Sequence, residues 1–214
     1  WTRNQDPGRI AEGVWRTNGG LAHSDMGSQW LIKAPEGLLL IDPNAGISFE
    51  QNWARIKAAG FDPMTVKYLL PTHEHGDHSP ACSLWRVVTG AKVIAFAEMA
   101  YMMQHHLPFA SGYGFHPPIP TDIVVTEEKT MDLAGLQVEV IRLPGHTYGS
   151  TGYLFEIAGT RYAAIGDVID RATEGIDGVH RLTLFLGQAE KAIIEVRPAL
   201  ACQSRAIFCK IHAT

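Results

Sequence analysis

The order of hydrophobic and polar positions predicts short strands in both halves of the chain. In the first half, apolar runs bounded by Gly and Pro predict strands at 13–17, 30–34, 38–42, 66–70 and 91–96. Similar runs in the second half predict strands at 123–126, 136–143, 152–157 and 161–165. Runs of this length are typical of buried strands, so we expect a core rich in β-sheet.

Hydrophobic residues at helical spacing predict four helices between these strands. One begins after Ser48, which forms an S-x-x-Q capping-box pattern with Gln51. A second is expected to begin with Ser79 as its N-cap and Pro80 at its first helical position. The remaining two are expected at 98–106 and 189–196. Groups of strands in both halves with helices between them predict an α+β fold, in which two sheets are sandwiched between helices.

Composition narrows the range of functions. With 214 residues, of which 46% are hydrophobic, the chain is expected to form one domain over 1–214. A net charge of -4 and the lack of any run of Lys or Arg give no reason to expect a nucleic-acid partner. No apolar run has the length needed to cross a bilayer, so we expect a soluble protein without a membrane partner. Because the sequence begins at Trp1, its compartment stays open.

One stretch, 71–78, has the composition of a metal site. It follows the apolar run 66–70 and holds three histidines and two acids within six positions, in an H-x-H-x-D-H pattern. Neutral imidazole and carboxylate are ligands of zinc, iron and manganese. His73 and His75 point the same way if the backbone is extended, and a turn at Gly76 lets Asp77 and His78 face a second position. The pattern therefore predicts two metal ions.

The H-x-H-x-D-H stretch resembles the signature of the metallo-β-lactamase superfamily. The loop 143–150 resembles the third-histidine loop of that family, and Gly166 with Asp167 resembles the aspartate loop of its glyoxalase II and lactonase-like members. The resemblance implies a four-layer αβ/βα sandwich with the site along one edge of the sheets. It also implies six metal ligands, with Asp167 bridging both metals: His73, His75, Asp77, His78, His146 and Asp167.

Three further positions take their interpretation from the resemblance. The family's late histidine, within a G-H-G motif, is missing here; His212 is the better candidate for its role and His180 the other. The part of the chain after about residue 168 is therefore expected to be atypical or truncated. Asp42 matches a structural aspartate that braces the metal loop, whereas Glu74 either supports the ligands or faces solvent.

The resemblance implies a hydrolase that attacks a carbonyl group with a metal-bound hydroxide, with Asp77 as a catalytic residue that orients the hydroxide. Two Zn²⁺ ions are expected, with iron or manganese as alternatives, and the small-molecule substrate is a lactam, a lactone or a thioester. Similarity extends both to third-subclass metallo-β-lactamases and to glyoxalase II or lactonase-like members. Two alternatives stay open: an iron oxidoreductase of the persulfide-dioxygenase kind, and a catalytically incomplete metal-binding fragment.

The stretch 108–120 is rich in Gly and Pro and is not expected to form regular structure. Its aromatic residues Tyr113 and Phe115 suit a flap that faces substrate, although a linker that packs on its own aromatics is an equal alternative.

Overall fold

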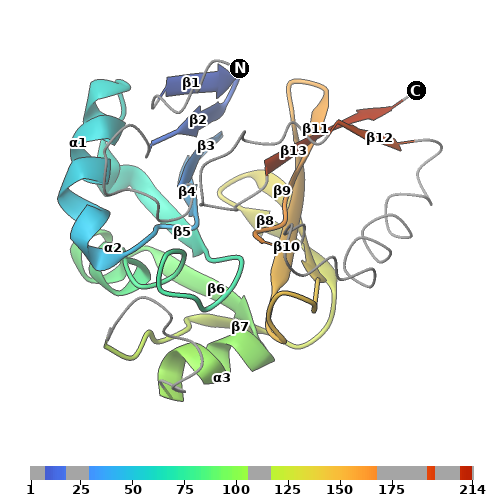
Figure 1. The fold of residues 1–214 in the computed structure, drawn as a ribbon. Helices are drawn as coiled ribbons and strands as arrows, with labels where there is room; N and C mark the ends of the chain where they lie inside the picture. The colour runs from blue at the N-terminus through green and yellow to red at the C-terminus, as the bar shows by residue number, and fades with distance from the viewer. Residues whose placement is uncertain (1–7, 18–28, 106–116, 168–191, 196–207, 214) are drawn as a thin grey trace, which may run out of the picture.

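Two β-sheets face each other in the computed structural model, which describes residues 8–17, 29–105 and 117–167 together with the backbone of 192–195 and 208–213 (Figure 1). The first sheet has the strand order β1 (Gly8–Ala11), β2 (Val14–Arg16), β3 (Trp30–Ala34), β4 (Gly37–Ile41), β5 (Val66–Leu70), β6 (Lys92–Phe96) and β7 (Ile123–Val125). The second has the order β12 (Ala192–Glu195), β13 (Phe208–Ala213), β11 (Thr160–Ala164), β10 (Thr151–Ile157), β9 (Leu136–Arg142) and β8 (Lys129–Leu133). The α+β fold expected from the sequence is confirmed, and four strands were not expected: β1, β8, β12 and β13.

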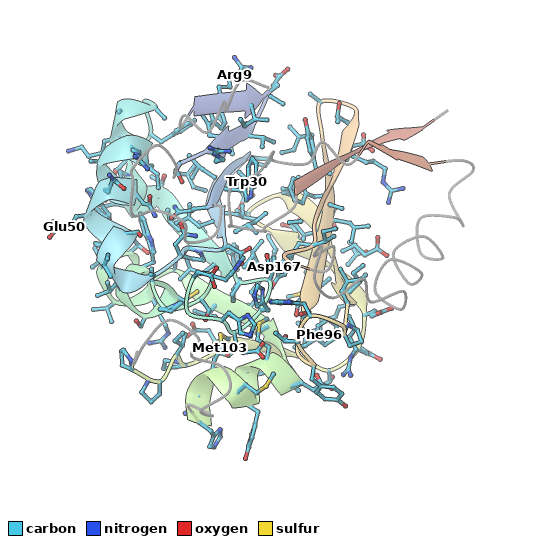
Figure 2. All side chains as sticks on the ribbon, in the orientation of Figure 1. Arg9, Trp30, Glu50, Phe96, Met103 and Asp167 are labelled. Atoms are coloured by element: carbon cyan, nitrogen blue, oxygen red, sulfur yellow. The ribbon has the colours of Figure 1, made fainter. Side chains whose placement is uncertain are left out.

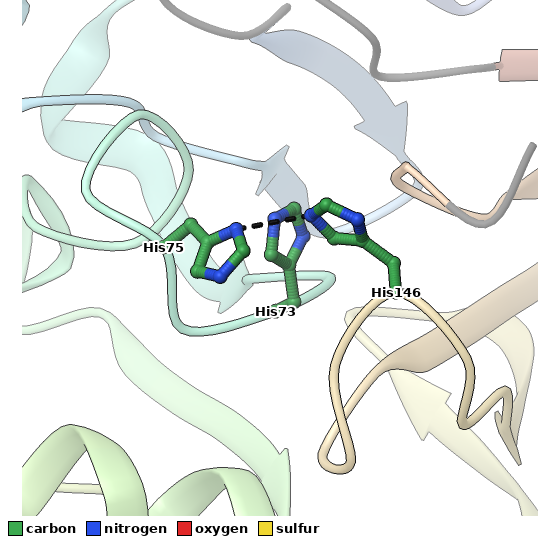
Figure 3. A group of neighbouring side chains, drawn as sticks. All are labelled: His73, His75 and His146. Atoms are coloured by element: carbon green, nitrogen blue, oxygen red, sulfur yellow. Dashed lines mark hydrogen bonds between the residues drawn. The ribbon is translucent and has the colours of Figure 1, made fainter. Parts of the chain in front are cut away.

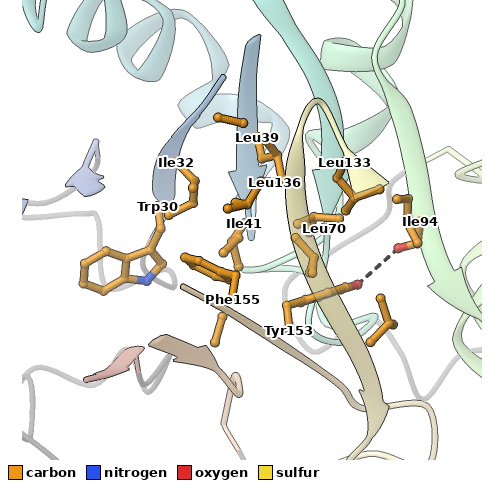
Figure 4. Close-up of a cluster of buried hydrophobic side chains, with 14 of the residues drawn as sticks. Trp30, Ile32, Leu39, Ile41, Leu70, Ile94, Leu133, Leu136, Tyr153 and Phe155 are labelled. Carbon is orange, nitrogen blue, oxygen red and sulfur yellow. Dashed lines mark hydrogen bonds between the residues drawn. The ribbon is translucent and has the colours of Figure 1, made fainter. Parts of the chain in front are cut away.

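The alternation of side chains along the strands separates two hydrophobic layers. Leu38 and Leu40 of β4 belong to an outer cluster with residues of the helices α1 (Phe49–Ala58), α2 (Cys82–Thr89) and α3 (Ala97–His105). Leu39 and Ile41 belong to an inner cluster with residues of the second sheet, among them Phe155 (Figure 4). Successive strand residues point to opposite faces, so a run of five buried residues supplies both layers. Among the described residues, no helix is both long and apolar enough to span a membrane.

Strand direction brings several strand ends to one region of the molecule. Strands β4 and β5 are parallel neighbours, with Ile41 opposite Leu70, so the residues that follow them leave the first sheet at the same edge. In the second sheet, β9 and β11 both run antiparallel to β10, and they end at Arg142 and Ala164 beside the start of β10. The four segments that follow these strands carry the histidines and acids of the expected site.

Of the two expected helix starts, the one at Ser48 is confirmed, although without its capping-box hydrogen bond, and the one at Ser79 is wrong. Ser48 is the N-cap of α1, but its side chain makes no capping hydrogen bond, because Ser48 ends the preceding 3-10 helix (Gly46–Ser48) and has helical rather than extended backbone angles. Helix α2 begins at Cys82, not after an N-cap at Ser79. The Ser79 hydroxyl instead donates to the carbonyl oxygens of Glu74 (3.1 Å) and His75 (3.4 Å), and so it stabilises the histidine-rich loop.

The expected helix at 189–196 is also wrong. Residues Ala192–Glu195 form β12, which pairs antiparallel with β13. Its two central residues, Ile193 and Ile194, are β-branched and favour strands. Pairing with β13 is a long-range interaction that helical spacing in the sequence does not reveal.

The phenol of Tyr153 joins the two sheets, and its removal tests how much this contact stabilises the fold. Its hydroxyl is buried and donates to the carbonyl oxygen of Pro71 (2.7 Å), with that of Ile94 at 3.2 Å (Figure 4). We expect Tyr153→Phe to lower the free energy of unfolding by about 1–3 kcal/mol, because two buried acceptors lose this donor. Chemical denaturation measures the change. Tyr148→Phe, at a side chain that is 77% exposed, is the control and should change stability little; equal effects of the two variants would contradict the prediction.

Candidate metal centre

The histidines and acids of the expected site gather where the two sheets meet. The stretch 71–78 follows β5 and Asp42 follows β4, while His146 and Asp167 follow β9 and β11 of the second sheet. Figure 2 shows Asp167 in the interior, between the first and second sheets. Residues more than 90 positions apart in the sequence therefore form one cluster, as strand direction requires.

Three imidazoles from the two sheets form the first group of the cluster. Ring nitrogens of His73, His75 and His146 all lie within 4.8 Å of one another (Figure 3). His146 Nε2 lies 3.0 Å from His75 Nδ1, and the ring of His73 stands nearly perpendicular to that of His146. Three nitrogen donors that converge in this way can hold one ion with tetrahedral geometry and leave a fourth position open.

A second group shares His73 with the first. It consists of His73, His78 and Asp167, whose donor atoms also lie within 4.8 Å of one another. Asp77 lies beside this group, with Oδ2 3.5 Å from His78 Nε2, and it is buried rather than on the solvent side of the loop. All six residues singled out from the sequence are thus brought together.

The carboxylate of Asp167 connects the two groups. Its Oδ1 lies 3.5 Å from His78 Nε2, whereas its Oδ2 lies 3.7 Å from His146 Nε2. One oxygen therefore faces each group. This is the position from which a carboxylate can bridge two ions.

Asp42 braces the loop, as the resemblance implied. Its Oδ1 accepts a hydrogen bond from the backbone N–H of Thr72 (2.7 Å), and the Thr72 hydroxyl donates to the same carboxylate at about 3 Å. Since that hydroxyl has one proton, it accepts from Nδ1–H of His73 at 3.1 Å. Asp42 Oδ2 also lies 3.0 Å from His78 Nδ1. Both histidines thereby turn Nε2 toward the cluster.

Asn44 fixes the other end of the loop. Its side-chain amide donates to the carbonyl oxygen of Asp77 (3.1 Å), and its backbone N–H donates to that of His78 (2.9 Å). Asp42 and Asn44 both have positive φ, 48° and 69°, which lets one short segment bond to both ends of the loop.

The protonation states of the cluster suit metal binding. Burial and the neighbouring imidazoles hold the pKa of His73 well below its ordinary value, and burial and His146 also lower the pKa of His75. Although burial lowers the pKa of His78, the charge of Asp42 and the nearby carboxylates of Asp77 and Asp167 raise it well above the usual range. An ion at the second group would therefore have to displace a proton from His78.

The donor set fits a cation in two further respects. His73 Nε2, His78 Nε2 and Asp167 Oδ1 are buried and have no hydrogen-bond partner among the described residues. Within the same part of the chain, the only ion-pair partners of Asp42, Asp77 and Asp167 are histidines, and no Lys or Arg neutralises them. Buried donors and acids without compensation are costly unless a cation balances them.

Of the histidines outside the cluster, the structure describes the side chain of His105 and the backbone of His212. His105 ends α3, where its Nδ1 is 2.9 Å from the carbonyl oxygen of Tyr101. His212 lies in β13, of which only the backbone is described. His180 and the expected flap residues Tyr113 and Phe115 lie outside the described residues, as do the remaining histidines, His23, His106 and His116.

Sequence reasoning missed how closely Gly166 approaches the loop. Gly166 has φ +57°, and a Cβ added there would contact Thr72 Oγ1, with Thr72 Cβ at 2.8 Å and His73 Nδ1 at 3.3 Å. Its place directly before Asp167 was the available signal. A side chain at 166 would displace the hydroxyl that orients His73.

We expect Gly166→Ala to weaken zinc binding at least tenfold, since it displaces the Thr72 hydroxyl that holds His73. Gly159→Ala is a matched control, because Gly159 has a similar φ of +71° but nothing within 4 Å of the added Cβ. The control should cost about 1–2 kcal/mol of stability through its backbone conformation alone and keep its zinc affinity. Competition with a chromogenic chelator measures the affinities. The same loss of affinity in both variants would show that backbone strain, not the contact with Thr72, is responsible.

Comparison with known proteins identifies relatives of the chain. It is 27% identical over 146 residues to a hydroxyacylglutathione hydrolase of Rhodospirillum rubrum, a match that covers 68% of this chain and 48% of that protein. The chain thus spans about half the length of this curated relative. Among solved structures, a metallo-β-lactamase of Cronobacter sakazakii has the same fold, with a TM-score of 0.72 at 22% identity over 87% of this chain and 74% of that one.

A second solved structure is that of a class B3 di-zinc metallo-β-lactamase from an Alaskan soil metagenome, with a TM-score of 0.66 and 25% identity over 84% of this chain and 73% of that one. The family model described as the metallo-beta-lactamase superfamily matches residues 24–198. Because this match covers most of the sequence, the chain belongs to the metallo-β-lactamase superfamily, a family of metallo-hydrolases.

Proposed function

We propose that the protein is a metal-dependent hydrolase that attacks the carbonyl group of a small-molecule lactam, lactone or thioester. The observation that supports this most directly is the Asp167 carboxylate, which offers one oxygen to each of two histidine groups. Two divalent ions that share a carboxylate suit hydrolysis of an acyl bond.

In this proposal His73, His75 and His146 would hold the first ion and His78 and Asp77 the second, and Asp167 would be available to both. Imidazole and carboxylate donors suit zinc first, with iron or manganese as alternatives. Such ions, when bound, lower the pKa of a coordinated water and polarise the carbonyl that is attacked. The chain's own acids and imidazoles then have to hold the ions in place and accept protons.

Asp77 is proposed as the catalytic acid–base group. Burial alone would raise its pKa, but the interaction with His78 outweighs burial and lowers it. The carboxylate is therefore ionised at neutral pH, so it can orient a water molecule by accepting a hydrogen bond from it and can then take its proton. A position beside His78 Nε2 keeps this carboxylate at the second group.

The loops around the metal centre, rather than the centre itself, determine which class of substrate is bound. The relatives named above are a hydroxyacylglutathione hydrolase and metallo-β-lactamases, which is consistent with a thioester or a lactam. Assays of the zinc-loaded protein with nitrocefin, a homoserine lactone and a glutathione thioester distinguish the three classes.

One observation favours a second candidate, an iron oxidoreductase of the persulfide-dioxygenase kind. The group His73, His78 and Asp167 has the composition of two histidines and one carboxylate that is used by mononuclear non-haem iron enzymes. Elemental analysis of protein purified with and without oxygen separates the candidates, because the hydrolase should bind about two zinc ions and the oxidoreductase one iron.

We expect the wild-type protein to bind about two divalent ions per chain, and His73→Ala combined with His75→Ala to bind one or none, since two of three donors in the first group are lost. Elemental analysis after gel filtration measures the stoichiometry. His105→Ala, which removes an imidazole outside the cluster, should keep the wild-type value. If the double variant also keeps that value, the ligand assignment is wrong.

Asp77→Asn is expected to reduce kcat by about 10²–10⁴-fold at matched metal occupancy, because an amide cannot accept the proton. Since Asn is nearly isosteric, the variant should stay folded and retain the ion at the first group. Steady-state kinetics with the best substrate of the panel measures the loss, with Asp62→Asn as an exposed control. Activity within about threefold of wild type would remove Asp77 from the mechanism.

A further inference from the structure

Glu74 lies between two of the expected ligands in the sequence but is not a member of either donor group. Its side chain is buried, with 4% of the residue exposed. The carboxylate extends to the loop after β9, where Oε2 accepts a hydrogen bond from Thr147 Oγ1 at 2.9 Å. Thr147 directly follows His146, so this bond connects the neighbours of two ligands that come from different sheets.

The other hydrogen bonds in the loop after β9 determine which group donates in the bond between Glu74 and Thr147. Ser150 Oγ accepts from the backbone N–H of Thr147 at 3.2 Å and lies 3.0 Å from Thr147 Oγ1. Because the Thr147 hydroxyl gives its one proton to Glu74, it accepts the proton of Ser150. Each of these groups is satisfied only when an acceptor occupies the position of the Glu74 carboxylate.

The bond spans the two loops at the point where their imidazoles meet. His75 Nδ1 and His146 Nε2 lie 3.0 Å apart, and each belongs to a residue next to one end of the Glu74–Thr147 bond. A backbone hydrogen bond from Thr151 N to Thr72 O (2.7 Å) joins the same loops further along. Two such links on one loop fix both its distance and its orientation.

We propose that Glu74 is a positioning residue whose hydrogen bond to Thr147 clamps His146 against His73 and His75, and so sets the metal affinity of this group. The second group depends on it less, since Asp42 and Asn44 hold that end of the loop independently. The inference rests on the proposed metal binding.

The test is a double-mutant cycle on Co²⁺ affinity, measured by chelator competition and by the absorption of bound Co²⁺. The Co²⁺ ion that is lost in His75→Ala identifies the first group. Glu74→Met and Thr147→Val each remove one end of the clamp and should weaken the binding of this ion by about 10–100-fold. The other Co²⁺ should change by less than about threefold. The double variant should bind Co²⁺ no more weakly than the worse single variant, because both remove the same interaction.

Conservative variants and a control separate positioning from a general loss of stability. Thr147→Ser and Glu74→Gln retain a donor and an acceptor, and they should restore most of the affinity even if Glu74→Met folds poorly. Thr89→Val removes a hydroxyl that bonds to Trp85 O at 2.7 Å at the end of α2, and it should leave both affinities unchanged.

The outcomes distinguish the clamp from the proposed function. Additive losses in the double variant, or an unchanged Co²⁺ affinity in both single variants, would overturn the clamp while metal binding stands. A wild-type protein that binds no Co²⁺ would overturn the proposed function and the clamp with it.

Discussion

The buried carboxylate of Asp42 is the interaction on which the geometry of the centre depends. It bonds to Thr72, and through the Thr72 hydroxyl it orients His73; it also faces Nδ1 of His78. Two histidines five positions apart are therefore held by one acid, which directly follows β4, the parallel neighbour of β5. Asp42 has a left-handed backbone conformation, with φ 48°. This strained conformation is tolerated because the hydrogen bonds of the carboxylate offset its conformational energy.

The core between the sheets fixes the distances of the centre as much as the polar bonds do. Four of the six donors follow β5 and the other two follow β9 and β11, so any shift between the sheets would separate them. Tyr153 bonds across to Pro71, and Gly166 approaches Thr72 too closely to admit a side chain. Hydrophobic packing, a buried phenol and a bare glycine thus hold the two ligand loops in register.

Sequence reasoning succeeded where a local pattern carries the information. Strands β2 to β7 and β9 to β11 were predicted because their apolar runs are short and bounded by Gly and Pro. The six donors were implied by the resemblance of the loops after three of these runs to those of the metallo-β-lactamase superfamily, and the structure brings them together. It failed where a contact outside the pattern decides. Ala192–Glu195 is a strand because it pairs with β13, which no spacing within the segment reveals. Ser79 bonds to the carbonyl oxygens of Glu74 and His75, on its N-terminal side, rather than capping α2.

The orientation of Glu74 shows the same limit inside the site itself. Its position between His73 and His75 indicates proximity to the ligands, but a residue there can face the ions, the solvent or the protein. The orientation of Glu74 is fixed by Thr147, which is 73 positions away in the sequence. The Thr147 hydroxyl reaches the carboxylate because the loops after β5 and β9 meet at the site. Spacing in the sequence thus identifies which residues can bind an ion, whereas contact between the loops decides how firmly they hold it.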